Sequence, residues 1–202
     1  MVGPDRSPPY AGQVKHSSDA QRLVALLNTL HLPDGDDVLA DGRAGSWVAR
    51  LLAEAGMEAE AEVATCEELQ DLREGVRQLV IARDGGELDA VVLNRARAVL
   101  RGTPLVLEIG DASHPPRLAA AGDPGLVGRG VQLAAAAYLA VRSGHEWQRL
   151  KVCAAEDCRW AFLDTSRNGT RRWCDMSDCG NRAKNRAWRE RRRPTGADVH
   201  LA

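Results

Sequence analysis

Two cysteine pairs of equal spacing constrain the fold of this chain more than any other feature. Four residues separate Cys153 from Cys158, four separate Cys174 from Cys179, and fifteen lie between the pairs. Each short loop turns two thiolates toward one ion, and the spacer is long enough to bring the second pair back and complete a tetrahedron. Two disulfides or four unconnected thiols are the alternatives, but the equal spacing and the flanking aromatic and basic residues favour one zinc ion. Four sulfur ligands leave no coordination position for water or substrate, so the predicted zinc is structural.

The spacer between the two pairs has the pattern of a β-hairpin. Residues 159–163 alternate like a strand, residues 167–170 predict a turn, and residues 171–173 are the expected returning strand. A module of this size has little apolar core of its own, so its aromatic side chains are expected to cover the metal. These side chains are Trp160, Phe162 and Trp173.

Charge divides the chain into an acidic body and a basic end. Residues 1–150 contain 15 Lys and Arg and 21 Asp and Glu, whereas residues 151–202 contain 12 and 7. The overall net charge of −1 therefore conceals two parts of opposite sign. This arrangement is typical of a regulator whose basic end contacts nucleic acid.

Composition excludes several classes of protein. Of the 202 residues, 44% are hydrophobic, which is enough for a core, and five cysteines are too few for a disulfide scaffold. The chain opens without the basic start and apolar run of a secretory signal, and no apolar stretch approaches the roughly 18 residues of a membrane span. We therefore expect a cytoplasmic protein. Alanine, leucine and arginine dominate and aromatic residues make up only 4%, so we expect it to be mainly α-helical with a small β-hairpin.

The first 146 residues are predicted to form a flexible tail and a helical domain. Proline and glycine in residues 1–16 indicate the tail, and residues 17–146 are expected to form a regulatory or sensor domain. The zinc module then spans residues 147–194, and residues 195–202 form a second tail. Apolar periodicity and capping signals predict helices over residues 18–30, 46–55, 88–100 and 126–141, and one that begins at a capping box at Thr65. A hairpin is expected to pair residues 105–109 with residues 117–119.

The chain after Cys179 has the composition of a cationic helix that ends at Pro194. One stripe of arginines recurs at helical spacing along it, formed by Arg182, Arg186, Arg189 and Arg193. A neighbouring face carries Lys184, Trp188, Arg191 and Arg192. A solvated face, or a helix that docks on an acidic protein surface, would have a similar composition.

Arginine-rich helices beside a zinc module favour nucleic acid as the partner. Guanidinium groups suit phosphate oxygens and the guanine edge, and a rigid helix fits the major groove of B-form DNA better than that of A-form RNA. DNA is therefore the preferred partner. The predicted nucleic-acid-binding residues are Arg171, Arg172, Arg182, Lys184, Arg186, Arg189, Arg192 and Arg193.

The carboxyl-terminal residues resemble the CGNR zinc-finger family. The resemblance rests on the two Cys-x4-Cys pairs, on residues 162–168 and 171–174, and above all on Cys179-Gly180-Asn181-Arg182, and it continues through Lys184 and Arg186. The body is more loosely similar to the usual partner domain of that family, through residues 26–30, Trp47 and Leu72-Arg73-x3-Arg77. The resemblance implies a bacterial protein with a helical amino-terminal domain, described as a stress-induced transcription regulator, and a zinc-ribbon-like finger.

Four residues of the body are the expected lining of a ligand pocket. This expectation rests on the resemblance and on helix position, because Arg73 and Arg77 are one turn apart and share a face. Salt bridges to the many acidic residues of the body explain the two arginines equally well. The four residues are Asn28, Trp47, Arg73 and Arg77.

Several other polar side chains have competing interpretations. Asn181 is expected to cap backbone groups beside the second cysteine pair, and Arg182 is expected to contact either a phosphate or a cysteine sulfur. Asp164 is expected to bind Arg167 or a turn amide. Cys66 lies where a helix begins, and we interpret it as a small buried residue rather than a redox centre.

The sequence favours a binding protein over an enzyme. The five histidines are scattered without nucleophile–base spacing, and no glycine-rich phosphate loop is present, so no catalytic residue is predicted. We expect a transcription regulator that binds DNA through the zinc module and basic helix, with a small-molecule effector for the body and a homodimer as further expectations. An RNA-binding or ribosome-associated factor, and a zinc-stabilised adaptor for acidic proteins, are the alternatives.

Overall fold

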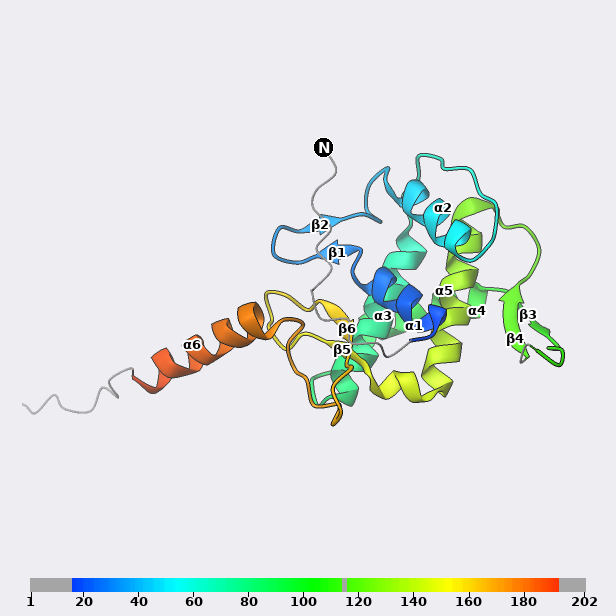
Figure 1. Ribbon diagram of the computed structural model, residues 1–202. Coiled ribbons are helices and arrows are strands. Elements are labelled where there is room, and N and C mark those ends of the chain that lie inside the picture. Colours follow the sequence, from blue (N-terminus) through cyan, green and yellow to red (C-terminus); the bar gives the residue numbers. More distant parts are fainter. Residues whose placement is uncertain (1–15, 114–115, 193–202) are drawn as a thin grey trace, which may run out of the picture.

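The computed structural model of the chain describes residues 16–113 and 116–192. In these ranges, six α-helices and three two-stranded antiparallel sheets confirm the predicted mainly helical fold (Figure 1). No helix in these ranges combines the length and hydropathy needed to cross a lipid bilayer. The two predicted tails lie outside the described residues, apart from His16, and so does Arg193.

The elements follow one another in the order helix, hairpin, three helices, hairpin, helix and zinc module. The helices are α1 (Ser18–Leu27), α2 (Ala44–Glu54), α3 (Glu67–Arg83), α4 (Ala90–Gly102), α5 (Gly125–Ser143) and α6 (Asn181–Arg191). The strands are β1 (Leu30–His31), β2 (Asp36–Asp37), β3 (Leu105–Glu108), β4 (Arg117–Ala120), β5 (Leu150–Val152) and β6 (Ala161–Leu163). A 3₁₀ turn, η1 (His145–Gln148), precedes β5, and a π-helical turn, η2 (Met176–Gly180), leads into α6.

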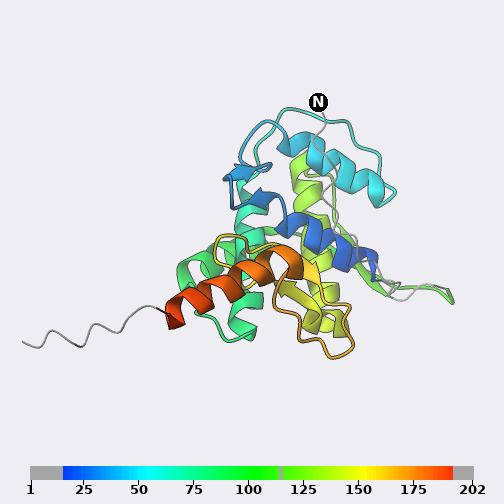
Figure 2. The same ribbon diagram turned by 60° about the vertical axis from the view of Figure 1, so that its left-hand side comes forward.

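The main core lies between α1, α2, α3 and α5 (Figures 1 and 2). Apolar residues at helical spacing, such as Leu23 and Leu27 of α1 and Leu72 of α3, are fully buried there. The same core continues beyond the body, because Leu150 of β5 and Ala161 of β6 are buried in it. The first strands of the zinc module therefore share the core of the helical domain.

The ends of α1 differ from the prediction because nearby side chains have other partners. The sequence pattern Ser18-x-x-Gln21 predicts Ser18 as the cap, but the cap is Ser17, whose hydroxyl accepts a hydrogen bond of 3.2 Å from the amide of Ala20. At the other end α1 stops three residues early, at Leu27. The side chain of the next residue, Asn28, is bound to the backbone of β6.

The start of α3 also corrects the prediction. The helix begins after Cys66 rather than at Thr65, and it has no side-chain cap. Cys66 is 1% exposed, and burial raises the pKa of its thiol to about 11. The interpretation of Cys66 as a small buried residue is confirmed.

The structure confirms one of the two predicted hairpins and corrects the other. Pairing of Leu105 with Ala120 and of Glu108 with Arg117 confirms the hairpin β3–β4, which stands out from the body (Figure 1). In the zinc module the prediction is wrong, because β6 pairs with β5, which precedes the first cysteine pair. Residues 171–173 form no strand. Strand β5 packs in the core through its apolar residues. Residues 171–173 include two arginines and are half-buried or exposed.

Gly45, the second residue of α2, is a position where any side chain collides with the backbone. A Cβ atom there would lie 1.7 Å from the carbonyl oxygen of Glu62. Gly45→Ala is therefore expected to lower the free energy of unfolding by about 3 kcal/mol, measured by thermal unfolding followed by circular dichroism. Gly102→Ala is the matched control, because a Cβ at the end of α4 meets open space and should not lower the midpoint. Equal midpoints for the two variants would contradict the close approach.

Candidate metal centre and basic helix

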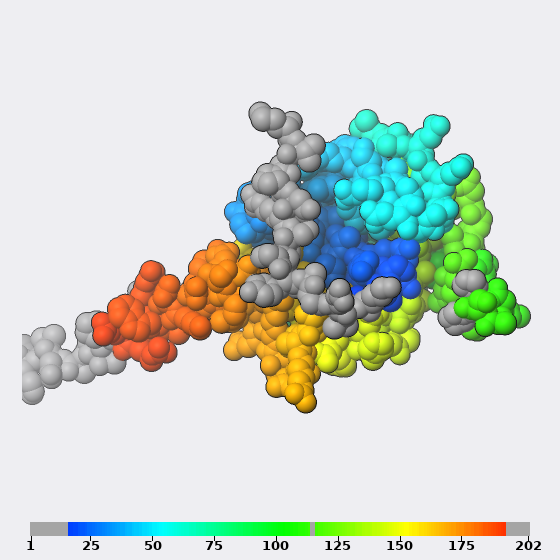
Figure 3. All heavy atoms as spheres, viewed as in Figure 1, coloured from blue at the N-terminus to red at the C-terminus, as the bar shows by residue number. Residues whose placement is uncertain are grey.

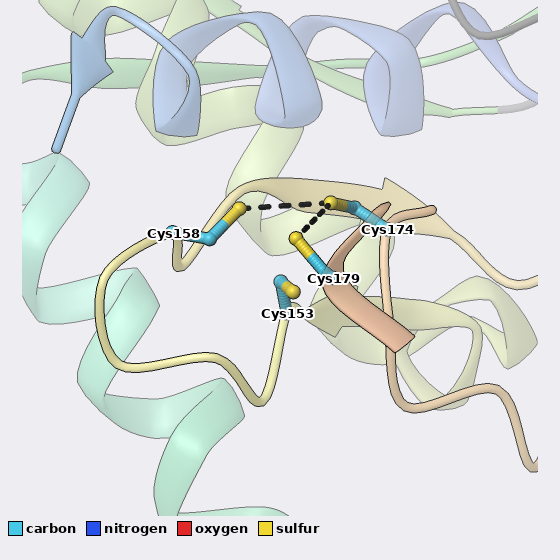
Figure 4. Close-up of side chains that lie close together, drawn as sticks. All are labelled: Cys153, Cys158, Cys174 and Cys179. Carbon is cyan, nitrogen blue, oxygen red and sulfur yellow. Dashed lines mark hydrogen bonds between the residues drawn. The ribbon is translucent and has the colours of Figure 1, made fainter. Parts of the chain in front are cut away.

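The four cysteines of the two pairs lie close together in space (Figure 4). The sulfur atoms of Cys158 and Cys174 are 3.6 Å apart, those of Cys174 and Cys179 are 3.7 Å apart, and all four lie within 4.8 Å of one another. Zinc–sulfur bonds of about 2.3 Å place the corners of a tetrahedron about 3.8 Å apart. A disulfide would require a separation of about 2.05 Å, and all four cysteines are free thiols. The prediction of one four-cysteine zinc site is confirmed.

The first cysteine pair is held by the loop between β5 and β6. The amide of Cys153 donates to the carbonyl of Trp160, and the amide of Cys158 donates to the carbonyl of Ala155, both at about 3 Å. Arg159 follows with φ of 49°, the left-handed conformation that lets the chain reverse directly after a ligand. The loop thus turns both sulfur atoms to the same side.

The second cysteine pair is held by the turn η2. The carboxylate of Asp175 caps this turn and accepts from the amides of Ser177 and Asp178. Gly180 follows the last ligand, and a Cβ there would lie 2.6 Å from the sulfur of Met176. The backbone then continues without a break into α6, so the metal site fixes the start of that helix.

Hydrogen bonds among the clustered thiols shift the pKa values of these groups. Hydrogen bonds from the thiols of Cys158 and Cys174 lower the pKa of Cys153, and donation to that thiolate raises the pKa of both donors. Cysteines bind zinc as thiolates, so metal binding at this cluster would release protons. Zinc bound at the four sulfur atoms would hold the two loops together.

Two residues of the CGNR segment support the cysteine sulfurs. Arg182 places Nη2 3.1 Å from the sulfur of Cys179, and the charge of that sulfur raises the pKa of Arg182. Of the two predicted roles for Arg182, the described contact is with sulfur. The side chain of Asn181 donates to the carbonyl of Ser177 at 2.9 Å, which confirms its predicted role at the backbone of this turn.

Asp164 organises the segment that joins the two pairs. It is 1% exposed, and its carboxylate accepts from the backbone amides of Ser166 and Arg171, each at 2.9 Å. Burial alone would raise the pKa of Asp164, but these hydrogen bonds outweigh it and hold the pKa below its ordinary value. The predicted bond to a turn amide is confirmed, whereas its alternative partner Arg167 makes no described contact with it.

The aromatic residues of the module take different positions. Phe162 is buried beneath the guanidinium of Arg171, whose Cζ lies 4.8 Å from the ring centroid. Trp160 is half-buried and meets the ring of His31 edge-on, so it packs toward the hairpin β1–β2. Trp173 is half-buried beside Gly180, next to the second pair. Coverage of the metal by all three remains a prediction.

Two of the four residues predicted to line a ligand pocket, Asn28 and Arg77, join the body to the zinc module. The amide side chain of Asn28 binds both backbone groups of Ala161, at 2.8 and 3.0 Å. Arg77 is 3% exposed and donates to the carbonyls of Leu27 and Arg159, each at 2.6 Å. Burial lowers the pKa of Arg77.

Arg73 and Trp47 complete that set. The guanidinium of Arg73 forms a two-point ion pair with Asp37, at 2.7 and 2.9 Å, so the salt-bridge alternative applies to it. Trp47 is 8% exposed and belongs to the main core. A ligand bound by these four residues stays a prediction, and each of them already has a partner in the fold.

Helix α6 carries four of the eight predicted nucleic-acid-binding residues away from the body (Figures 1 and 3). None of its residues is buried. Arg182 and Arg186 lie on the face beside the loop of the first cysteine pair, in a groove whose other wall includes Glu156 and Asp157. The start of the predicted arginine stripe therefore lies beside this loop.

The remaining predicted cations differ in how strongly they are engaged. Arg171 donates to the carbonyls of Trp173 and Cys174, so it supports the second pair more than it extends a free surface. Arg172 stacks on Trp173 and Arg192 stacks on Trp188, with Cζ–centroid distances of 5.4 and 4.3 Å. In the described ranges, the side chains of one group of exposed cations on α6 form no hydrogen bond or ion pair. This group comprises Lys184, Arg186, Arg189 and Arg191.

Sequence reasoning missed several residues that hold the module in place. Strand β5 was not predicted, although Leu150 and Val152 alternate with Lys151 in the pattern of a short strand. Arg83, at the end of α3, binds the carbonyl of Leu150 at 2.7 Å and that of Trp147. No local pattern marks Arg83, because its partners are backbone atoms far along the chain.

Comparison with known proteins agrees with this geometry. Residues 149–192 match the family model described as CGNR zinc finger. No curated protein matches the chain in sequence. The matched segment begins just before β5 and ends just after α6, so it contains all four clustered cysteines and the helix that they anchor. The carboxyl-terminal part of this chain, residues 149–192, is a CGNR zinc finger with a four-cysteine site for one zinc ion.

Proposed function

We propose that the chain is a transcription regulator, without enzymatic activity, that binds duplex DNA through the zinc finger and α6. The observation that carries the proposal is the placement of a cationic helix on a metal-anchored turn, projecting away from an acidic body (Figure 3). Lys184, Arg186, Arg189 and Arg191 have no intramolecular ion pair in the described part of the chain, so they are available to phosphates.

The metal site gives this helix a defined direction. The last ligand, Cys179, is two residues before α6, and Arg182 in the first turn of α6 contacts its sulfur. A helix held in this way loses little conformational freedom when it docks, so more of the interaction energy remains for binding. Tight packing of β5 and β6 on the body links the helix to the rest of the molecule.

A salt series tests the proposal. Fluorescence anisotropy of zinc-loaded protein with duplex DNA is expected to give binding whose logarithm falls linearly with the logarithm of salt concentration. Replacing both Arg186 and Arg189 with alanine should weaken binding by roughly tenfold to a hundredfold at low salt and reduce the slope by about two, without loss of zinc. The matched control replaces Arg50 and Arg101, two exposed arginines of the body, and should leave affinity nearly unchanged.

Competition distinguishes the three candidate partners. Duplex DNA, a hairpin RNA and an acidic polypeptide are each added to the preformed DNA complex at one salt concentration. Preference for DNA supports the proposal. Stronger competition by RNA would support an RNA-binding factor instead, and stronger competition by the acidic polypeptide would support a protein adaptor.

A further inference from the structure

The body contains a cavity of about 570 Å³ that is separate from the zinc finger. Its lining comes mainly from the carboxyl end of α4 and the amino half of α5, beside Pro104 at the start of the hairpin β3–β4. A cavity of this volume is large enough for a small organic ligand. The lining residues used below are Glu68, Ala98, Val99, Thr103, Val127 and Gln132.

Gln132 in the wall of this cavity has a buried acceptor without a partner. The residue is 1% exposed, and its Nε2 donates to the carbonyls of Pro104 at 3.1 Å and Ala121 at 2.7 Å. These two bonds fix the orientation of the amide. Its Oε1 atom is buried and accepts no hydrogen bond in the described structure. A donor from water or from a bound molecule would satisfy this acceptor.

The other polar side chains of the lining offer acceptors as well. The hydroxyl of Thr103 donates its proton to the carbonyl of Val99 at 2.8 Å, which leaves its oxygen to accept. Glu68 contributes a carboxylate at the exposed rim, and no Lys, Arg or His lines the cavity within the described residues. Thr103 and Glu68 thus offer acceptors and one negative charge to a ligand, and the Oε1 atom of Gln132 lies behind the surface of the lining. The rest of the wall is apolar, including Val99 and Val127.

We propose that this cavity binds a small organic cation: a primary amine whose ammonium group faces Thr103 and Glu68 and whose apolar part contacts the valines. An ammonium group has N–H donors and a positive charge, which complement the hydroxyl oxygen of Thr103 and the carboxylate of Glu68. The amino end of α5 adds a partial positive charge to the same cavity, so an organic acid is the competing ligand class. Binding here does not depend on nucleic-acid binding by α6.

Three probes of similar shape test the proposal on the zinc-loaded full chain. 2-Phenylethylamine, 2-phenylethanol and 3-phenylpropionate are titrated separately, and binding is followed by protein chemical shifts in NMR spectra. The amine is expected to bind with a dissociation constant on the order of 1 mM, typical of a fragment of this size. The alcohol is expected to bind about fivefold more weakly and the acid more weakly still. Equal or tighter binding of the acid would overturn the proposal.

Variants locate the bound amine and its charge. Val127→Phe fills the cavity, and Ala98→Phe does the same from an exposed position that should not affect folding; both should weaken amine binding by at least about tenfold. Glu68→Gln should weaken the amine about fivefold and leave the alcohol unchanged, because only the charge is removed. Glu67→Gln, one residue away and outside the lining, is the matched control. Amine binding that survives both phenylalanine substitutions would overturn the site. The variant that lacks Arg186 and Arg189 should bind the amine normally, which separates this test from that of DNA binding.

Discussion

Replacing Cys174 with serine is expected to leave the protein without zinc after dialysis against a weak chelator, whereas the parent chain retains about one ion. Cys174 lies 3.6 and 3.7 Å from the sulfur atoms of Cys158 and Cys179, so its loss opens the tetrahedron between the two pairs. Structural four-ligand zinc sites contribute on the order of 10 kcal/mol to the folding of their modules, and a three-sulfur site retains only part of this. Metal content is measured by inductively coupled plasma mass spectrometry.

The extent of unfolding in this variant tests how the chain is divided. Loss of zinc should release the two cysteine loops and α6, while α1 to α5 stay folded around their own core. Amide hydrogen exchange should therefore accelerate in residues 153–160 and 171–191 and change little in α3 and α5. Cys66→Ser is the control, because it removes the fifth cysteine, which lies outside the cluster, and should keep one zinc ion per chain. Full zinc content in Cys174→Ser, or exchange throughout the body, would contradict this division.

Replacing Arg77 with leucine is expected to lower the free energy of unfolding by about 3–5 kcal/mol. The guanidinium is 3% exposed and donates to two carbonyls, one at the end of α1 and one directly after Cys158. Leucine would leave both carbonyls, and the carboxylate of Glu74, without this donor. The thermal midpoint should fall by roughly 10 °C, because each kcal/mol corresponds to about 2–4 °C in a chain of this size.

Two further variants and one readout separate this effect from a general loss of charge. Arg77→Lys keeps the charge and reaches one carbonyl, so it should recover part of the lost stability. Arg50→Leu, on the exposed face of α2, should change the midpoint by no more than about 1 °C. Zinc content should remain one ion per chain in Arg77→Leu, because no ligand is changed. A midpoint equal to that of the parent would contradict a stabilising role for the two hydrogen bonds of Arg77.

The sequence was most informative where a chemical constraint is local. The two cysteine pairs predicted the metal site because four thiolates in short loops have few other uses, and the spacing alone specifies the ligands. The helices were predicted for the same reason, since an amphipathic period reports which face is buried. The hairpin β3–β4 was also predicted, because Pro104 and Gly110 mark the two ends of its first strand.

The sequence was least informative where a partner is distant along the chain. Residues 159–163 were assigned a following strand as partner, but the strand that pairs with β6 precedes the cysteines and is chosen by burial of Leu150 in the common core. Asn28 and Arg77 were predicted to meet a ligand, and their partners are backbone atoms of the finger. Almost any residue can supply the backbone group that such a side chain binds. The residue types of the partners therefore gave no signal for these contacts.

The side chain of Asn28 acts as one rung of a sheet. It donates to and accepts from Ala161, as a neighbouring strand would, on the strand that is otherwise paired with β5. The free edge of β6 is therefore closed by a residue from a distant helix end. Cutting the chain before residue 149 would therefore not give a finger that can be moved unchanged to another protein. A graft onto another scaffold would have to bring an amide at the position of Asn28, or present an open edge that invites strand addition by another molecule.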